Sequence, residues 1–217
     1  MREPRILITL HYYPGNASLA PHRLLEELGV PYELVLVDRS RNAHKQEPYL
    51  QLNPNGLIPT LVQDGLVLWE TIAILLHLAD QYPDRGLAPA PGTAERAHLY
   101  KWLAHFTNTL QAEFMIYFYP ERYGVREADL AGIKALAADR LTQAFQRIEA
   151  QIGDGPYLLG EAVCVADFML LMMIRWGRLL DLPPRAMPRL SRLAQRLLSR
   201  PAVERVLARE GLTAPFI

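Results

Sequence analysis

The nine residues 53-NPNGLIPTL-61 decide how this chain folds. Two prolines and a glycine stand before and within the start of an apolar run. Because proline cannot donate to a strand ladder, Pro59 is expected at a strand entrance or in a cis turn. A cis Ile58–Pro59 bond would turn the amide and carbonyl of Ile58 outward, where an extended peptide could pair with them as a short extra strand. An ordinary proline-rich turn is the alternative, and this stretch alone favours neither.

The segments on either side of this stretch alternate between strand and helix patterns. Residues 5–13 are rich in β-branched and aromatic side chains and predict a strand. A helix ended by Gly29 follows, and residues 31–38 predict a second strand, so a parallel βαβ unit is expected. Downstream, Asp64-Gly65 separates two short apolar runs and predicts a hairpin. The order β-α-β, linker, β-β-α indicates a small mixed sheet with helices.

The strand pattern disappears after residue 82. Residues 83–92 contain three prolines and two glycines and are interpreted as a linker. Amphipathic periodicity then predicts long helices, and the run 168–174, apolar on every face, predicts a helix buried inside a bundle. The predicted organisation is an α/β domain over residues 1–82, the linker 83–92 and an all-α domain over residues 93–217.

Composition limits the classes of partner and compartment. The 217 residues are 50% hydrophobic and 21% charged, with a formal net charge of zero, so neither nucleic acid nor an anionic membrane is expected as a partner. The single cysteine, Cys164, excludes an internal disulfide and agrees with a reducing compartment. The first apolar stretch is too short for a secretory signal, so a cytoplasmic protein is expected. Six histidines without ligand spacing predict no metal site.

Glu70-Thr71 stands where the hairpin ends and the next helix begins. A helix N-terminus offers unpaired amides and a positive dipole, which favour a bound carboxylate. Thr71 adds a hydroxyl for that carboxylate, and Glu70 can pair with an ammonium group. An amino-acid headgroup would satisfy both, whereas a plain helix cap is the alternative.

Three motifs in this order resemble the glutathione transferase superfamily: NPNGLIPTL, WETIAILLHLAD at residues 69–80, and GEAVCVADFML at residues 160–170. Residues 11–38 resemble the bacterial beta class in particular. The resemblance covers nearly the whole chain. It implies a thioredoxin-like N-terminal domain, an all-helical C-terminal domain, glutathione as co-substrate between them, and a homodimer.

The resemblance also implies roles for individual residues. Ile58, beside Pro59, would pair with the cysteinyl backbone of glutathione, and Glu70 with Thr71 would hold its γ-glutamyl group. Lys45 is the nearest match to a basic residue for the glycyl carboxylate.

The turn after the first strand departs from the beta-class pattern. Ala17 stands where those members place a cysteine, which excludes mixed-disulfide chemistry with a protein thiol at that position. Cys164 lies at the capping position of the family's folding motif, whose aspartate is Asp167. A small buried residue and a structural carboxylate are the favoured interpretations of this pair.

Another group must therefore activate the thiol of glutathione. Lowering a thiol pKa from about 8.5 to about 6.5 requires roughly 2.7 kcal/mol, and one charge-assisted hydrogen bond supplies about 1.5–3 kcal/mol. Ser18, Asn16 and Tyr12 can each donate such a bond from the turn or the strand end. Ser18 ranks first and Asn16 second, although each alone could simply cap the helix.

The helical half offers a second-substrate pocket. Polar and aromatic positions on one long helix would line it if the fold holds: Thr107, Asn108, Gln111, Phe114 and Tyr117. A contact across a dimer is the alternative. The expected function is conjugation of the glutathione thiolate to small hydrophobic electrophiles. An interaction protein without turnover and a glutathione-dependent isomerase or peroxidase remain alternatives.

Arginines recur at helical spacing near the C-terminus: Arg185, Arg189, Arg192, Arg196 and Arg200. A solvated basic face is the favoured interpretation, and a docking surface for an acidic partner is the alternative.

Overall fold

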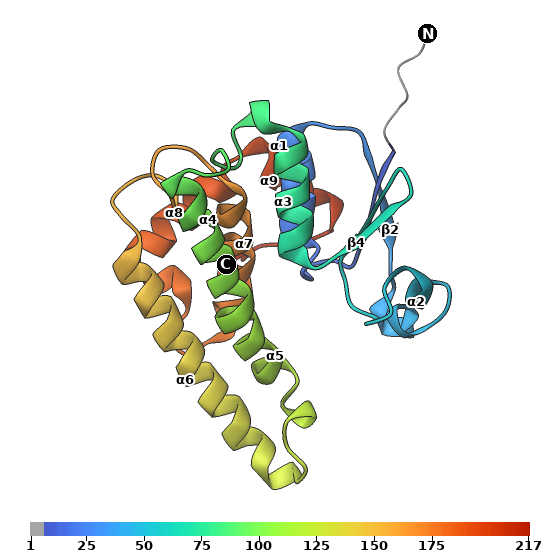
Figure 1. Cartoon of the computed structure of the whole chain (residues 1–217). Coiled ribbons are helices and arrows are strands. Elements are labelled where there is room, and N and C mark those ends of the chain that lie inside the picture. Colours follow the sequence, from blue (N-terminus) through green and yellow to red (C-terminus); the bar gives the residue numbers. More distant parts are fainter. Residues whose placement is uncertain (1–6) are drawn as a thin grey trace. The chain divides into compact units, whose positions relative to one another are not determined.

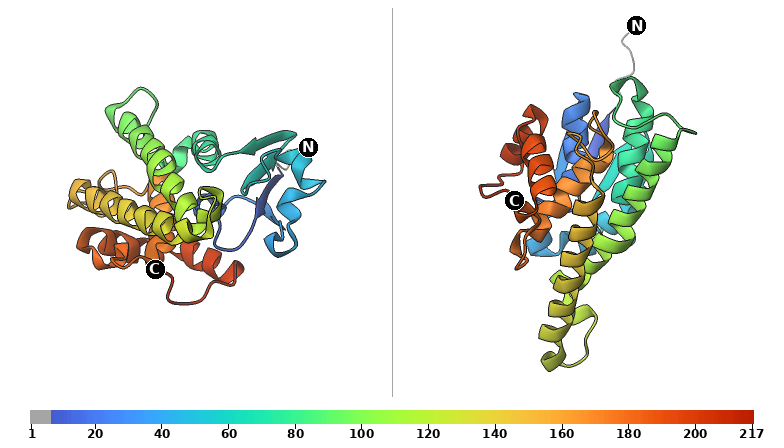
Figure 2. Two further views of the ribbon diagram at one scale, coloured as in Figure 1. Left: turned by 90° about the horizontal axis from the view of Figure 1, so that it is seen from below. Right: turned by 90° about the vertical axis from the view of Figure 1, so that its left-hand side faces the viewer.

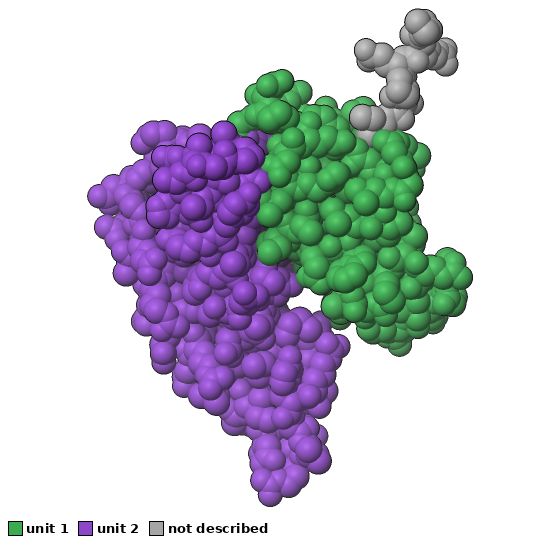
Figure 3. Space-filling view, in the orientation of Figure 1, with its two compact units in different colours: residues 1–86, 199–214 green, residues 87–198, 215–217 purple. Residues whose placement is uncertain are grey.

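The computed structural model describes residues 7–217, so residues 5 and 6 of the predicted first strand lie outside the described part. The chain divides into two compact units, coloured separately in Figure 3. Unit 1 runs to Gly86 and also includes Ser199–Ala214, whereas unit 2 comprises Leu87–Leu198 and Pro215–Ile217. The division falls within the predicted linker. The segment Ser199–Ala214, which sequence periodicity groups with the helical half, is part of unit 1.

Unit 1 contains a four-stranded mixed sheet in the order β2-β1-β3-β4. Its strands are β1 (Ile8–Tyr12), β2 (Tyr32–Leu36), β3 (Thr60–Gln63) and β4 (Leu66–Trp69). β1 is parallel to β2, as the βαβ pattern predicts, and β3 is antiparallel to both β1 and β4. Asp64 and Gly65 have φ angles of 48° and 85°, the left-handed pair that a tight hairpin turn requires.

Four helices accompany this sheet: α1 (Leu19–Leu28), α2 (Tyr49–Leu52), α3 (Thr71–Gln81) and α9 (Pro201–Arg209). α1 ends at Gly29 in a left-handed conformation, and it packs against both α3 and α9 (Figure 1). The stretch 39–46 contains two short 3-10 turns, Arg39–Arg41 and Ala43–Lys45. The short α2 has no sequence periodicity that would predict it.

Unit 2 is helical, as expected (Figure 2). Its α-helices are α4 (Ala94–His105), α5 (Ala112–Phe118), α6 (Glu127–Gln151), α7 (Val165–Trp176) and α8 (Pro188–Leu198). A π-helical segment, Phe106–Gln111, joins α4 to α5. The predicted buried helix is α7, whose residues from Val165 to Arg175 are all buried. Within residues 7–217, no helix combines the length and apolarity needed to cross a membrane.

The start of α7 explains the roles of Cys164 and Asp167. Asp167 is fully buried and accepts hydrogen bonds from the amides of Leu158 and Cys164, each at 2.8 Å. The Cys164 side chain in turn caps the amide of Asp167, which completes a capping box with sulfur in place of a hydroxyl. Burial, together with the neighbouring Asp167 carboxylate, raises the pKa of the Cys164 thiol. The pair therefore has the structural role expected from the sequence.

Candidate functional site

The candidate site in unit 1 is built from three segments: the turn 13–18, Ile58 and the start of α3. Pairing of β1 with β3 places His11 opposite Thr60, so the turn that follows β1 lies beside the entrance to β3. The Thr71 hydroxyl donates to the carbonyl of Ala17 at 3.5 Å, which joins the start of α3 to the same turn. Backbone pairing and one side-chain bond thus bring together residues that are 54 positions apart.

Ile58 has its main chain available for a ligand. The Ile58–Pro59 peptide bond is cis, and strand pairing begins only at Thr60. The amide and carbonyl of Ile58 make no hydrogen bond to any residue from 7 to 217. Its side chain is buried against Val37 and Tyr49, which holds the residue in place.

The loop before Ile58 is fixed by side chains from α2 and its end. The carbonyl of Leu57 accepts hydrogen bonds from the Tyr49 hydroxyl at 2.5 Å and from the Asn53 amide at 2.8 Å. Tyr49 also bonds the Thr60 hydroxyl at 2.9 Å. The free Ile58 main chain is therefore flanked by well-anchored neighbours.

Glu70 adopts an unusual backbone conformation at the N-cap of α3. Its φ of 75° lies in a region that non-glycine residues rarely occupy, and such outliers cluster at ligand sites. Its side chain is exposed and forms no bond within the described part of the chain. Thr71, by contrast, is buried. The site thus presents one unpaired carboxylate next to the first-turn amides of α3.

Lys45 lies close to this loop, but its ammonium group is already bonded. Nζ donates to the carbonyl of Asn55 at 2.9 Å. Gly56, with φ of 58°, is required here because a Cβ would come within 2.6 Å of the His44 carbonyl oxygen. The predicted contact of Lys45 with a glycyl carboxylate remains a prediction.

The three candidate thiol-activating residues differ in burial and in hydrogen bonding. Ser18 is fully buried, and its hydroxyl donates to the carbonyl of Tyr13 at 3.2 Å and accepts from its amide at 3.3 Å. Asn16 is half-buried, and its side-chain carbonyl accepts from the amide of Ala17 at 2.7 Å. The side-chain NH₂ of Asn16 makes no bond to a described residue. Tyr12 is half-buried, with its ring 6.2 Å from that of His22.

Sequence reasoning missed Glu210, which contacts this turn from the C-terminal segment. Its carboxylate accepts from the amide of Gly15 at 2.8 Å and lies 2.7 Å from Nδ1 of His22. The side chains of His22 and Glu210 are both fully buried. No local pattern relates residues 195 positions apart, so only the tertiary structure reveals this contact.

The predicted pocket residues in unit 2 differ in accessibility. Asn108 is exposed and Gln111 half-buried on the π-helical segment, whereas Phe114 and Tyr117 are buried. The Phe114 ring stacks on Phe118 with centroids 5.5 Å apart and therefore packs within the unit. Their part in an electrophile pocket stays a prediction.

Comparison with known proteins establishes the family. The model of the glutathione S-transferase N-terminal domain matches residues 7–80, and that of the C-terminal domain matches residues 110–201. Glutathione S-transferase GstA of Escherichia coli O157:H7 is 30% identical over 208 residues, which cover 94% of this chain and 98% of that protein. The chain belongs to the glutathione S-transferase family. These matches show that the chain is an enzyme of this family. They confirm the superfamily and the fold class predicted from the sequence.

Solved glutathione transferase structures share this fold over nearly the whole chain. A homologue from Sulfitobacter with bound glutathione superposes with a TM-score of 0.87 at 27% identity, covering 95% of this chain and 99% of its own. The beta-class enzyme of Sphingomonas chungbukensis gives a TM-score of 0.83 at 32% identity, with 94% of this chain and 100% of its own covered.

Across residues 7–217 of this glutathione transferase, no cluster of three or more potential metal ligands is present.

Proposed function

We propose that this glutathione transferase binds glutathione on unit 1 and conjugates its thiolate to small hydrophobic electrophiles. The observation that carries the proposal is the main chain of Ile58, which pairs with no described part of the protein although β3 begins only two residues later. An unpaired amide and carbonyl at a strand entrance are suited to an extended peptide ligand. The glutathione bound to the Sulfitobacter homologue supports this assignment.

The start of α3 supplies the second half of the binding site. The exposed carboxylate of Glu70 suits the ammonium of a γ-glutamyl group. The first amides of α3, beginning with that of Thr71, suit the α-carboxylate, which the helix dipole also favours. Because Thr71 bonds the carbonyl of Ala17, a tripeptide held at Ile58 and Glu70 would place its sulfur near the turn 13–18.

Asn16 is the thiol-activating donor that the geometry favours. The Ser18 hydroxyl is buried and already bonded in both directions to Tyr13, so it has no hydrogen left to donate to a ligand. The NH₂ group of Asn16 donates to no described residue, so both of its hydrogens are available for a ligand. A bond from Asn16 to the thiolate of about 1.5–3 kcal/mol would lower the thiol pKa by roughly one to two units.

The chemistry follows from this thiolate. The thiol proton leaves to solvent, the sulfur lone pair forms a bond to the electrophilic carbon, and the leaving group departs with its electron pair. Ala17 offers no protein thiol, so no covalent enzyme intermediate forms at that position.

Titration of bound glutathione tests the donor. The thiolate absorbance of the complex is followed with pH for wild type, Asn16→Ala, Ser18→Ala and Tyr12→Phe. We expect Asn16→Ala to return the thiol pKa towards its free value near 8.5 and to lower conjugation of an activated aryl halide at neutral pH. An unchanged thiol pKa in Asn16→Ala would contradict the assignment.

Retention on immobilised glutathione tests the binding site separately. Glu70→Gln should weaken retention because it removes the charge that faces the ammonium group. Asp64→Asn, an exposed acidic residue in the neighbouring hairpin, serves as the matched control. Retention of wild type without conjugation would favour the interaction-protein alternative, and turnover of a peroxide or an isomerisable substrate alone would favour the other two activities.

We also infer a homodimer. β4 forms an edge of the sheet and exposes Leu66, Val67 and Trp69, with 43%, 38% and 39% of their surface accessible. An exposed apolar edge strand is a site for association with another chain, and a second copy of this protein can bury it. Light scattering of the eluted protein checks the assembly, and a monomeric mass would contradict it.

A further inference from the structure

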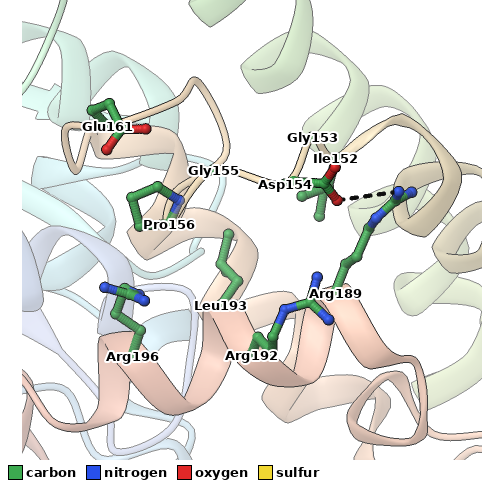
Figure 4. A pocket seen from close by; sticks show the side chains of 10 residues that line it. All are labelled: Ile152, Gly153, Asp154, Gly155, Pro156, Glu161, Arg189, Arg192, Leu193 and Arg196. Carbon is green, nitrogen blue, oxygen red and sulfur yellow. Dashed lines mark hydrogen bonds and ion pairs between the residues drawn. The ribbon is translucent and has the colours of Figure 1, made fainter.

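The arginines predicted as one basic stripe have different surroundings in the structure. Arg185 donates to the carbonyl of Ile217 at 2.8 Å, and Arg200, in unit 1, pairs with Glu27. The remaining three, Arg189, Arg192 and Arg196, line a pocket of about 310 Å³ in unit 2 (Figure 4). All five arginines are exposed or half-buried, as a solvated basic face requires, and the central three also border a cavity.

The pocket lies between α8 and the loop that follows α6. Leu190, Leu193, Ala194 and Leu197 are the buried residues of α8. They fix the helix, and the three arginines stand at positions i, i+3 and i+7. At a rise of about 1.5 Å per residue, these positions span roughly 10 Å along the helix.

The opposite wall is loop backbone rich in glycine. It comprises Ile152, Gly153, Asp154, Gly155, Pro156 and Glu161. The amides of Gly153, Asp154 and Gly155 form no hydrogen bond with residues 7–217. Unpaired amides on one wall and guanidinium groups on the other are both donors, and both suit anionic oxygen atoms.

The arginine at the start of α8 is held in place before any ligand binds. The Glu149 carboxylate accepts from the amides of Arg189 and Leu190, each at 2.8 Å. The Arg189 guanidinium donates to the carbonyl of Glu149 at 3.3 Å and lies 3.4 Å from Asp154. Asp154 has 90% of its side chain exposed, so this ion pair is weak and a ligand can replace it.

Arg192 is an exposed arginine in the middle of the pocket lining. Among the residues that the structure describes, none forms a hydrogen bond or ion pair with it. With three arginines and two carboxylates, those of Asp154 and Glu161, the pocket lining has a formal charge of +1. Guanidinium groups match phosphate oxygens in a bidentate geometry, which favours phosphate over a simple halide.

We propose that this pocket binds a small soluble polyanion with phosphate groups. The volume is that of a small-molecule site, and the arginine spacing suits two anionic groups on one ligand. All lining residues belong to unit 2, whereas the proposed glutathione site belongs to unit 1. The proposal therefore stands independently of glutathione binding.

Titration of the full chain with inorganic pyrophosphate tests the proposal. Calorimetry is run with wild type, Arg192→Gln and the matched control Arg147→Gln, which removes an exposed arginine of α6 outside the pocket. We expect saturable binding that Arg192→Gln weakens by about tenfold, the loss of one charge-assisted hydrogen bond. Arg147→Gln should change the affinity by less than about twofold.

Nuclear magnetic resonance locates the site, because glycine amides fall in a distinct spectral region. Pyrophosphate should shift the amide signals of Gly153 and Gly155, and saturating glutathione should leave these shifts unchanged. Inorganic phosphate should bind more weakly than pyrophosphate if two anionic groups are recognised. Absence of saturable binding, equal weakening in both variants, or shifts confined to the start of α3 would each overturn the proposal.

Discussion

The carboxylate of Glu210 accepts a hydrogen bond of 2.8 Å from the main-chain amide of Gly15. Its second oxygen lies 2.7 Å from Nδ1 of His22, on the helix that follows the turn. One buried carboxylate thereby ties the C-terminal segment of unit 1 both to the turn that carries Asn16 and to the helix that follows this turn. Removing a buried carboxylate that accepts from two donors lowers the free energy of unfolding by more than losing either hydrogen bond alone, because both donors are left unsatisfied.

Replacement of Glu210 should destabilise the protein and disturb the turn. We expect Glu210→Ala to lower the free energy of unfolding by about 3 kcal/mol, because the amide of Gly15 and the ring of His22 both lose a charged partner. Urea unfolding measures this loss. Glu204→Ala, an exposed acidic residue on α9, is the control and should cost less than about 0.5 kcal/mol. A loss no greater than that of the control would show that the turn holds without Glu210.

A second prediction concerns acid stability and the contact between α1 and α9. Burial favours the neutral form of Glu26, but hydrogen bonds from Tyr32, Arg205 and Arg209 outweigh it and lower the Glu26 pKa from 4.5 to about 2. A lowered carboxylate pKa stabilises the fold above about pH 4.5, and this contribution is lost as the pH falls towards 2. The stability difference between wild type and Glu26→Gln should therefore shrink from pH 5 to pH 3. The exposed Glu33→Gln serves as control, and a pH-independent difference for Glu26→Gln would contradict the prediction.

The sulfur cap of α7 gives a third prediction. Because a hydroxyl accepts a stronger hydrogen bond than a thiol, Cys164→Ser should preserve or raise stability by up to about 1 kcal/mol. Asp167→Ala should lower it by about 3 kcal/mol, since two buried amides lose their acceptor. Thermal unfolding compares the variants.

The same thiol should be chemically inert in the folded protein. Cys164 is 3% exposed and its pKa is raised by burial, so alkylation by iodoacetamide should be slow until denaturant unfolds the chain. Rapid labelling under native conditions would contradict the buried cap.

The last prediction tests where the sulfur of glutathione lies. The carbonyl of Ala17 bonds Thr71, so a thiol introduced at residue 17 would stand beside the proposed binding site. Ala17→Cys incubated with oxidised glutathione should form a mixed disulfide faster than Ser40→Cys, which places a thiol at an exposed position outside the turn. Mass spectrometry measures both rates. Equal rates would argue against a bound tripeptide at this turn.

The local sequence was sufficient for the parts of the fold that short-range rules govern. Asp64-Gly65 predicted the hairpin because few residue types accept two consecutive left-handed conformations. Gly29 predicted the end of α1 because glycine adopts a left-handed conformation without steric cost. The motif around Pro59 predicted the strand entrance, and Ile58 indeed precedes the first pairing of β3. Family membership followed from motifs in the right order.

Only the tertiary structure distinguished residues whose chemistry is similar. Sequence ranked Ser18 above Asn16, yet burial commits the Ser18 hydroxyl to Tyr13 and leaves the Asn16 amide with donors. The contact of Glu210 with Gly15 joins segments that are distant along the chain. The pocket beside Arg192 is closed by a loop that has no sequence periodicity. Such contacts depend on how whole elements pack, whereas turns and caps depend on a few neighbouring residues, and this difference set the limit of what the sequence alone determined.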